Sequence, residues 1–144
     1  MSQDRYLRHS LIDWFDQESV RKAFVLVVGA GAIGNEVVKC LSLLGIGRIH
    51  IVDFDRIEIH NLTRSVLFTE SDVGRYKAEV AAEAAAHLSP DTTATFTVGD
   101  VWRCLNSEQL SQFDAVFCCV DNYEARVRLN RLCLLARVDF YNSG

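Results

Sequence analysis

The sequence predicts an α/β fold: a parallel, Rossmann-like sheet with helices on both faces, preceded by an N-terminal helical arm. Three observations support this prediction. Short apolar runs alternate with segments of helical periodicity, a glycine-rich turn follows the first run, and an acid ends the second. Strands that alternate with helices form parallel sheets. Right-handed crossovers then favour the strand order 3-2-1-4-5.

The first half of the chain contains two expected strands with a helix between them. Phe24–Val28 is a continuous apolar run that ends at Gly29, as a fully buried strand would. Apolar residues then recur at helical spacing over residues 33–44, and glycines follow that end the helix. Arg48–Asp53 (RIHIVD) is the second expected strand.

The second half of the chain continues the same alternation. A helix is expected at residues 77–88, where alanines share one face with larger apolar residues, and Pro90 follows it. The sequence predicts three more strands and one more helix in the remaining chain. The strands are expected at residues 92–98, 115–120 and 138–142, and the helix at residues 123–136.

Composition and length indicate one soluble domain preceded by an arm. The chain has 144 residues, of which 49% are hydrophobic and 24% charged, values that are ordinary for a globular protein. We expect residues 1–22 to form a polar, partly helical arm and residues 23–144 to form the domain. Because the chain stops at Gly144 directly after the fifth expected strand, we expect the full enzyme to continue beyond it.

Charge and cysteine content exclude several classes of partner and location. The net charge of −4 gives no overall attraction to nucleic acid or to anionic membranes. The five cysteines are odd in number and form no Cys-x-x-Cys pair, which is typical of a reduced, cytoplasmic protein. The polar start of the chain is unlike a signal peptide, and no apolar run reaches the roughly 20 residues that span a membrane.

A glycine motif between the first strand and the first long helix predicts an anion-binding turn. Gly29 would permit the tight turn, Gly31 would let a phosphate approach the backbone, and Gly34 would let helix and strand pack closely. Asp53 ends the second strand, 19 residues after Gly34, where an acid accepts hydrogen bonds from ribose hydroxyls. Together these residues predict an adenine nucleotide. The alternatives are a turn without a ligand and a capping aspartate.

Charged residues after Asp53 indicate which nucleotide is bound. Asp55 opens a polar segment that brings in Asn61 and Arg64, and Lys77 follows at the start of the next helix. Cations aimed at one nucleotide suggest a triphosphate, whereas a dinucleotide site holds only a pyrophosphate. Asp121 follows the fourth strand at the ligand-binding edge of the sheet, where a carboxylate suits Mg²⁺. The alternatives are solvated surface charges and a helix cap.

Several motifs in series resemble one family. The chain resembles the adenylation domain of ubiquitin-activating-type enzymes, the ThiF/MoeB/HesA group, from Arg5 to Gly144. Linked motifs in the family's order are more specific than any one of them. They are Arg5-Tyr6-x-Arg8, VLVVGAGAIG, IVDFD, NLTR, DVGRYK and VDN.

The resemblance implies an ATP-dependent enzyme whose residues 23–144 form the nucleotide-binding adenylation domain. It implies that Asp53 holds the ribose and that Asn61, Arg64 and Lys77 contact the phosphates of ATP. Asp121 is implied to bind Mg²⁺ and to be catalytic, together with Arg64 and Lys77. The implied reaction joins a carboxylate to AMP and releases pyrophosphate.

The resemblance also implies a partner and an assembly. The acceptor would be the C-terminus of a ubiquitin-like or sulfur-carrier protein, or a peptide. Family members work as dimers, so a homodimer is expected, with Arg8 reaching into the neighbouring active site as a further catalytic residue. Three rival functions remain open: an NAD-binding oxidoreductase, a non-catalytic partner subunit, and a dehydratase-like relative acting on modified tRNA.

The chain departs from the family's pattern near the arm and the loops. Ser65 stands where glutamine is usual, Tyr76 replaces a common proline, and His9-Ser10 replaces the usual glutamine of the arm. The charged residues of the motifs are intact.

The cysteines are interpreted as core residues and not as nucleophiles. Cys118 and Cys119 belong to an apolar strand, and Cys40 and Cys133 are assigned to the apolar sides of helices. Cys104 is expected in a loop.

Overall fold

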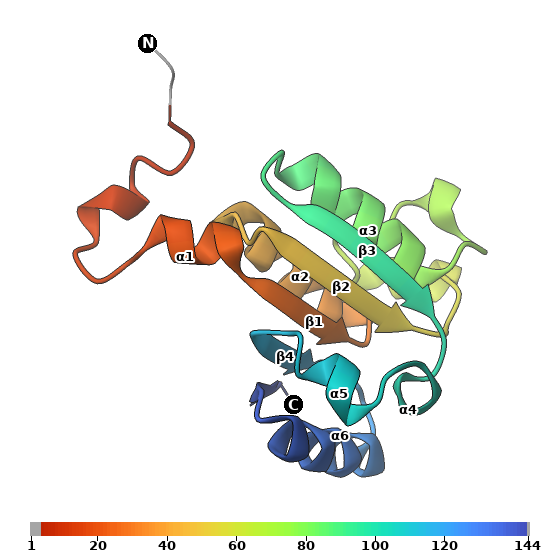
Figure 1. The fold of residues 1–144 in the computed structure, drawn as a ribbon. Coiled ribbons are helices and arrows are strands. Elements are labelled where there is room, and N and C mark those ends of the chain that lie inside the picture. Colours follow the sequence, from red (N-terminus) through yellow and green to blue (C-terminus); the bar gives the residue numbers. More distant parts are fainter. Residues whose placement is uncertain (1–3, 144) are drawn as a thin grey trace.

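The computed structural model describes residues 4–143, so the first three residues of the expected arm and Gly144 lie outside it. Five parallel strands form one sheet in the order β3-β2-β1-β4-β5 (Figure 1), which confirms the predicted order. The strands are β1 (Phe24–Val28), β2 (Arg48–Asp53), β3 (Thr93–Val98), β4 (Ala115–Cys118) and β5 (Asp139–Asn142).

Helices cover the sheet on both faces. The α-helices are α1 (Gln17–Lys22), α2 (Ala32–Leu44), α3 (Lys77–Leu88), α4 (Val101–Cys104), α5 (Ser107–Leu110) and α6 (Tyr123–Ala136). Short 3₁₀ helices are η1 (His9–Leu11), η2 (Ile59–Thr63) and η3 (Glu70–Asp72).

Alternate side chains of β1 belong to two separate cores. Val25 and Val27 pack with buried residues of α2 and α3, whereas Leu26 and Val28 pack with buried residues of α4, α5 and α6. Burial on both faces explains why β1 is apolar at every position instead of at alternate positions. The strand is therefore fixed in the middle of the sheet, and the turn after it lies at the carboxyl edge.

The predicted boundaries are close, with differences that have local causes. The two long helices at residues 77–88 and 123–136 are confirmed at both ends. The fourth strand ends at Cys118, two residues earlier than predicted, and β3 and β5 each begin one residue later. Helices α4 and α5 were not predicted; they begin at the side-chain caps Asp100 and Asn106. Cys104 therefore ends a helix and is not in a loop.

Burial confirms the core assignment for three of four cysteines. Cys118, Cys119 and Cys133 are buried, whereas Cys40 is exposed and its assignment to the core was wrong. The buried face of α2 includes Val38 and Leu41. Cys40 lies two residues after Val38, which places it on the opposite side of a helix with 3.6 residues per turn.

The N-terminal arm is tethered to the ends of two helices. Tyr6 is only 4% exposed, and its hydroxyl lies 3.3 Å from Ser89 Oγ at the end of α3. Gln17 Nε2 donates a hydrogen bond to Leu44 O at 3.0 Å, at the end of α2. Figure 1 shows the arm at the amino end of β1. It therefore lies far from the carboxyl edge of the sheet.

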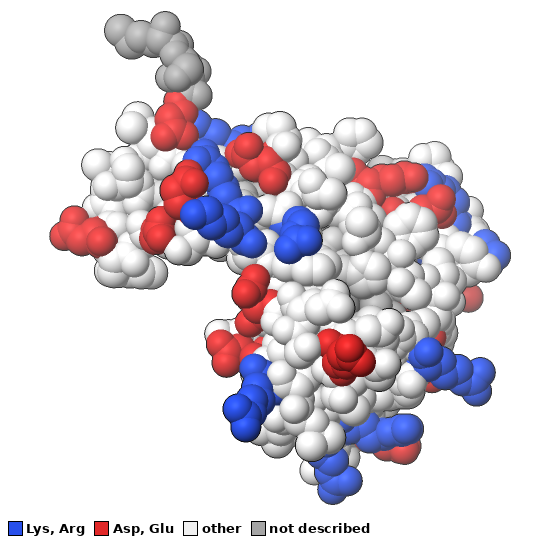
Figure 2. Space-filling model, viewed as in Figure 1, with Lys and Arg blue, Asp and Glu red and all other residues white. Residues whose placement is uncertain are grey.

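Surface charge is mixed in sign. Figure 2 shows acidic and basic side chains interspersed on the face viewed, with a broad uncharged area between them. Within residues 4–143, no helix combines the length and the apolar character that a membrane crossing requires.

Candidate functional site

A pocket of about 560 Å³ opens at the carboxyl ends of β1, β2 and β4. In open parallel sheets this edge, where the strand order reverses, is where ligands bind. The pocket brings together most of the residues predicted from the sequence to hold the nucleotide. Those that line it are Gly29, Gly31, Asp53, Asp55, Asn61, Arg64, Lys77 and Asp121.

The three glycines of the turn have three different geometries. Gly29 has a φ of 95°, and a Cβ there would lie 2.8 Å from Cys119 O. A Cβ on Gly34 would collide with the Gly29 carbonyl oxygen, so glycine is required where α2 crosses the turn. A Cβ on Gly31 would meet no atom of the described residues within 4 Å, because it would project into open space at the start of α2. That space suits an anion at a helix N-terminus.

Asp53 connects the glycine turn to the loop after β2. Its Oδ2 accepts a hydrogen bond from Ala30 N–H at 2.7 Å, and its Oδ1 accepts one from Asp55 N–H at 2.7 Å. Burial raises the pKa of the Asp53 carboxyl, and these two hydrogen bonds oppose that rise. Each carboxylate oxygen keeps a further lone pair. Ribose binding by Asp53 is compatible with this geometry and stays a prediction.

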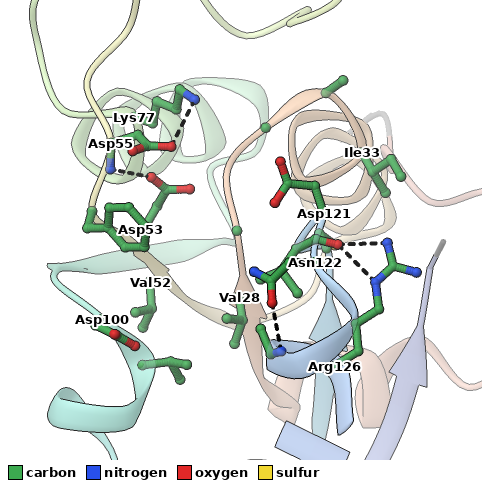
Figure 3. Close-up of a pocket in the computed structure, with 18 of the residues that line it drawn as sticks. Val28, Ile33, Val52, Asp53, Asp55, Lys77, Asp100, Asp121, Asn122 and Arg126 are labelled. Atoms are coloured by element: carbon green, nitrogen blue, oxygen red, sulfur yellow. Dashed lines mark hydrogen bonds and ion pairs between the residues drawn. The ribbon is translucent and has the colours of Figure 1, made fainter. Parts of the chain in front are cut away.

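Lys77 and Asp55 form a pair on one side of the pocket (Figure 3). Lys77 Nζ lies 3.5 Å from Asp55 Oδ2, and Lys77 N–H donates a hydrogen bond to Asp55 O at 3.0 Å. The Lys77 side chain is only 13% exposed. A bound anion would therefore meet a cation that is already held in place.

Asn61 and Arg64 belong to the segment around η2. Asn61 is buried and its Oδ1 accepts a hydrogen bond from Glu58 N–H at 2.9 Å, which leaves its NH₂ group as the donor for a ligand. Arg64 is exposed at the rim, and its Nη1 donates to His60 O at 3.0 Å. The guanidinium of Arg64 is thus folded onto its own 3₁₀ helix, and contact with a phosphate requires its side chain to turn.

Asp121 lies across the glycine turn from Lys77 and Asp55 (Figure 3). The alternative that Asp121 caps the next helix is wrong, because Asn122 is the cap: its Oδ1 accepts a hydrogen bond from Ala125 N–H at 2.8 Å. Asp121 itself forms no hydrogen bond or ion pair with the described residues, and its carboxylate is exposed at the pocket.

The carboxylates of the pocket would suit Mg²⁺ if a bound nucleotide supplied most of the metal ligands. Within residues 4–143 no group of three or more His, Cys, Asp or Glu side chains could hold a metal ion. Mg²⁺ is usually bound by one or two carboxylates together with substrate phosphates and water. The free carboxylate of Asp121 is the group that would bind it here.

Two predicted residues lie outside the pocket. Gly34 is in the first turn of α2, where a Cβ would collide with the Gly29 carbonyl oxygen, so its role is in packing. Arg8 is exposed on the arm and is not among the residues that line the pocket of its own chain. Its expected role in a neighbouring subunit stays a prediction.

Sequence reasoning missed two arginines and the residue that orients the turn. Arg126 and Arg128 line the pocket, and Arg126 Nη2 donates to Val120 O at 2.8 Å. Arg126 is four residues after the cap Asn122, a spacing that places both on one helix face and could have revealed it. Asn35 is fully buried; its Nδ2 donates to the carbonyls of the turn and its Oδ1 accepts from Leu67 N–H.

Comparison with known proteins assigns the family. The family model described as the ThiF family matches residues 4–144. The chain belongs to the ThiF family. The glycine turn, Asp53, Lys77 and Asp121 all lie within the residues that match the family.

Two relatives show how this ThiF-family chain compares in length. SUMO-activating enzyme subunit 2 of Dictyostelium discoideum is 40% identical over 128 residues, which cover 88% of this chain and 19% of that protein. Molybdopterin-synthase adenylyltransferase of Salmonella typhimurium is 33% identical over 137 residues, covering 93% of this chain and 55% of that protein. The chain thus spans about a fifth of the first relative and just over half of the second.

Solved structures of E. coli MccB have the same fold. MccB with AMPCPP and MccA matches with a TM-score of 0.86 and 27% identity, over 99% of this chain and 45% of that one. MccB with ATP matches with a TM-score of 0.78 and 30% identity, over 89% of this chain and 39% of that one.

Proposed function

We propose that this chain is the ATP-binding part of an adenylyltransferase that transfers AMP to a carboxylate. One observation carries the proposal: Asp53, Lys77 and Asp121 line a single pocket over the glycine turn, with Arg64 at its rim. A triphosphate and a cation need groups of both signs around one anion-binding turn, which this arrangement supplies. ATP binding by MccB, a structural relative, supports the same nucleotide.

The pocket residues suggest a pose for ATP. The phosphates would lie over Gly31 at the N-terminus of α2, where a Cβ would meet only open space. The ribose would lie beside Asp53, whose carboxylate is fixed by two backbone N–H groups. Lys77, Asn61 and Arg64 would then face the phosphates, Arg64 after its side chain leaves His60 O.

The reaction needs positioning and charge neutralisation more than a protein nucleophile. An acceptor carboxylate oxygen would form a bond to the α-phosphorus, and the bond from that phosphorus to the pyrophosphate oxygen would break. The acceptor needs no general base, because a carboxylate is already ionised near neutral pH. Mg²⁺ held by Asp121, when bound, would neutralise charge on the phosphate oxygens. Lys77 and Arg64 would stabilise the leaving pyrophosphate.

The proposal extends to acceptor, assembly and location. The acceptor would be the C-terminus of a ubiquitin-like or sulfur-carrier protein, or a peptide, in a cytoplasmic enzyme. We propose a homodimer in which Arg8 of one subunit reaches the pocket of the other. A relative named as a subunit of SUMO-activating enzyme makes a heterodimer the alternative. Mass measurement of the purified full-length enzyme, alone and with candidate partners, distinguishes the two.

Pyrophosphate exchange tests the proposed function against NAD-dependent chemistry. Full-length enzyme with ATP, Mg²⁺ and labelled pyrophosphate should incorporate label into ATP only when a suitable carboxylate acceptor from a panel is added. Calorimetric titration should show binding of ATP with Mg²⁺ and much weaker binding of NAD. Tight NAD binding without any acceptor-dependent exchange would favour the oxidoreductase instead.

A further inference from the structure

Two residues behind the pocket, Arg56 and Tyr76, form a contact that the nucleotide site does not use directly. The Arg56 guanidinium carbon lies 3.8 Å from the centre of the Tyr76 ring. Arg56 Nη1 also donates a hydrogen bond to Gly74 O at 2.7 Å. Neither Arg56 nor Tyr76 is among the residues that line the pocket. The backbone of Asp55 and Lys77, their chain neighbours in the pocket lining, links the pair to the pocket.

Arg56 and Tyr76 face each other in a short antiparallel ladder beside the pocket. On one side of the pair, Lys77 N–H donates to Asp55 O at 3.0 Å; on the other, Ile57 N–H donates to the carbonyl before Tyr76 at 2.9 Å. The pair thus occupies a non-hydrogen-bonded position, where side chains of antiparallel strands lie closest. Asp55 and Lys77 are the next pair of this ladder, on the pocket side. The stacked side chains of Arg56 and Tyr76 therefore lie directly beside the pair that lines the pocket.

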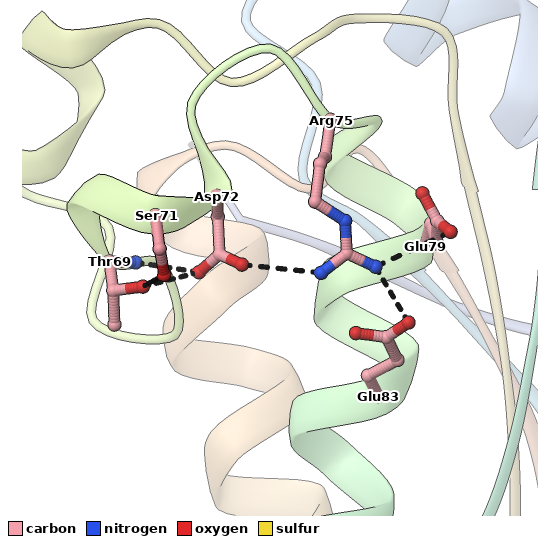
Figure 4. A network of polar contacts seen from close by, with 6 residues as sticks. All are labelled: Thr69, Ser71, Asp72, Arg75, Glu79 and Glu83. Atoms are coloured by element: carbon pink, nitrogen blue, oxygen red, sulfur yellow. Dashed lines mark hydrogen bonds and ion pairs between the residues drawn. The ribbon is translucent and has the colours of Figure 1, made fainter.

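The residue before Tyr76 is anchored separately, by ion pairs to α3 and η3 (Figure 4). Arg75 Nη2 lies 2.7 Å from Glu83 and 3.3 Å from Glu79 on α3, and its Nη1 lies 3.3 Å from Asp72. These partly exposed ion pairs hold Arg75, the residue before Tyr76, to the side of α3. The stack on Tyr76 is a second, separate contact, one residue nearer to Lys77.

We propose that Arg56 and Tyr76 are positioning residues, whose stack holds Lys77 against Asp55 on the phosphate side of the pocket. The proposal rests on the proposed function, in which Lys77 contacts phosphates. Tyr76 has a φ of −72°, inside the range that a proline ring imposes. Its N–H donates no hydrogen bond to the described residues. Proline would therefore fit here and restrain the backbone at the same point, which offers a rescue variant.

Pyrophosphate exchange by the full-length enzyme tests the proposal. Tyr76→Ala should lower kcat about tenfold with little change in the KM for ATP, because small misplacements of a positioned group slow the chemical step. Tyr76→Phe, which keeps the ring, and Tyr76→Pro, which restrains the backbone, should retain kcat. Combined with Lys77→Ala, Tyr76→Ala should cause no further fall, since both changes remove one function.

A matched stack elsewhere separates positioning from general stability. The Arg48 guanidinium carbon lies 4.2 Å from the centre of the Phe24 ring, at the amino ends of β1 and β2. Arg48→Gln should lower the melting temperature as Tyr76→Ala does, but leave kcat unchanged. An unchanged kcat in Tyr76→Ala, or effects of Tyr76→Ala and Lys77→Ala that add independently, would overturn the proposal.

Amide hydrogen exchange keeps this test separate from that of the proposed function. If the unmodified full-length enzyme shows no acceptor-dependent pyrophosphate exchange, the proposed function fails, whatever the variants do. Faster exchange of the Lys77 amide hydrogen in Tyr76→Ala, but not in Tyr76→Phe, would still show that the stack holds this ladder. Equal rates in all three proteins would overturn the positioning role.

Discussion

The backbone N–H of Ala30 donates a 2.7 Å hydrogen bond to the Asp53 carboxylate and so joins the glycine turn after β1 to the end of β2. The parts of the pocket that would hold phosphate and ribose are thereby one hydrogen-bonded unit. The second Asp53 oxygen extends this unit to Asp55 and, through its ion pair, to Lys77. A change at Asp53 should therefore affect both the fold and the ligand.

We expect Asp53→Ala to lower the free energy of unfolding by about 1–3 kcal/mol, because two backbone N–H groups lose their acceptor. The same variant should lose most of its ATP affinity. Urea denaturation and calorimetric titration measure the two effects. Asp114→Ala is the control: Asp114 Oδ2 accepts a hydrogen bond from Phe24 N–H at 2.7 Å at the opposite edge of the sheet. A similar loss of ATP affinity in Asp114→Ala would contradict a specific role for Asp53.

Alanine at Gly31 should weaken ATP binding, whereas alanine at Gly34 should destabilise the fold. Gly31→Ala places a methyl group in open space, so folding should change by less than about 1 kcal/mol while ATP affinity falls at least tenfold. Gly34→Ala meets the Gly29 carbonyl, so the protein should lose several kcal/mol of stability. Thermal unfolding with and without ATP measures both. Normal ATP stabilisation of Gly31→Ala would show that phosphate does not approach this turn.

Thiol reactivity should follow burial. Burial raises the pKa of the Cys133 thiol to about 11, and the pKa values of Cys118 and Cys119 are also raised by burial. An aromatic disulfide reagent at pH 8 should therefore modify Cys40 quickly and these three only after unfolding. Fast modification of all four in the folded protein would contradict the assigned core.

From the raised pKa of the Cys133 thiol we expect the protein to lose stability at alkaline pH. In the unfolded chain a cysteine ionises near pH 8.5, whereas folded Cys133 stays neutral until about pH 11. The unfolded state thus gains charge first, and stability present below pH 8.5 is lost as the pH rises toward 11. Denaturant titrations at several pH values over this range give the free energy of unfolding at each pH. This free energy should fall less steeply with pH in Cys133→Ala than in the unmodified protein. Equal slopes in the two proteins would count against the neutral buried thiol.

The middle of the sheet was predictable because nearly all apolar residues of β1 and β2 are buried, whereas the edge strands β3 and β5 contain no buried residue. Phe24–Val28 is an apolar run ended by a glycine turn, and Arg48–Asp53 carries three apolar residues and ends in an acid; both were predicted with correct bounds. Short helices were missed because four residues give too little periodicity to detect. A local signal existed for α5, where Asn106 and Gln109 form a reciprocal cap.

The site was predictable in position but not in its hydrogen bonds. Glycine spacing and strand-end acids place Gly31, Asp53 and Asp121 at one edge of the sheet whatever the loops do. The rotamer of Arg64, which bonds to His60 O, depends on a 3₁₀ helix that the sequence did not reveal. Arg126 was missed because an arginine in a helix usually points to solvent.

The measurement that tests the account most directly is acceptor-dependent pyrophosphate exchange in full-length Asp121→Ala. Since Asp121 bonds to none of the described residues, this variant should melt as the unmodified enzyme does and still bind ATP measurably. Its exchange rate should fall by roughly 10²–10³, as when a preorganised charge stabiliser is removed. Asn106→Ala, which removes the cap of α5 outside the pocket, should lose stability but keep its exchange rate. An exchange rate in Asp121→Ala equal to that of the unmodified enzyme would contradict the assignment of this pocket as the adenylylation site.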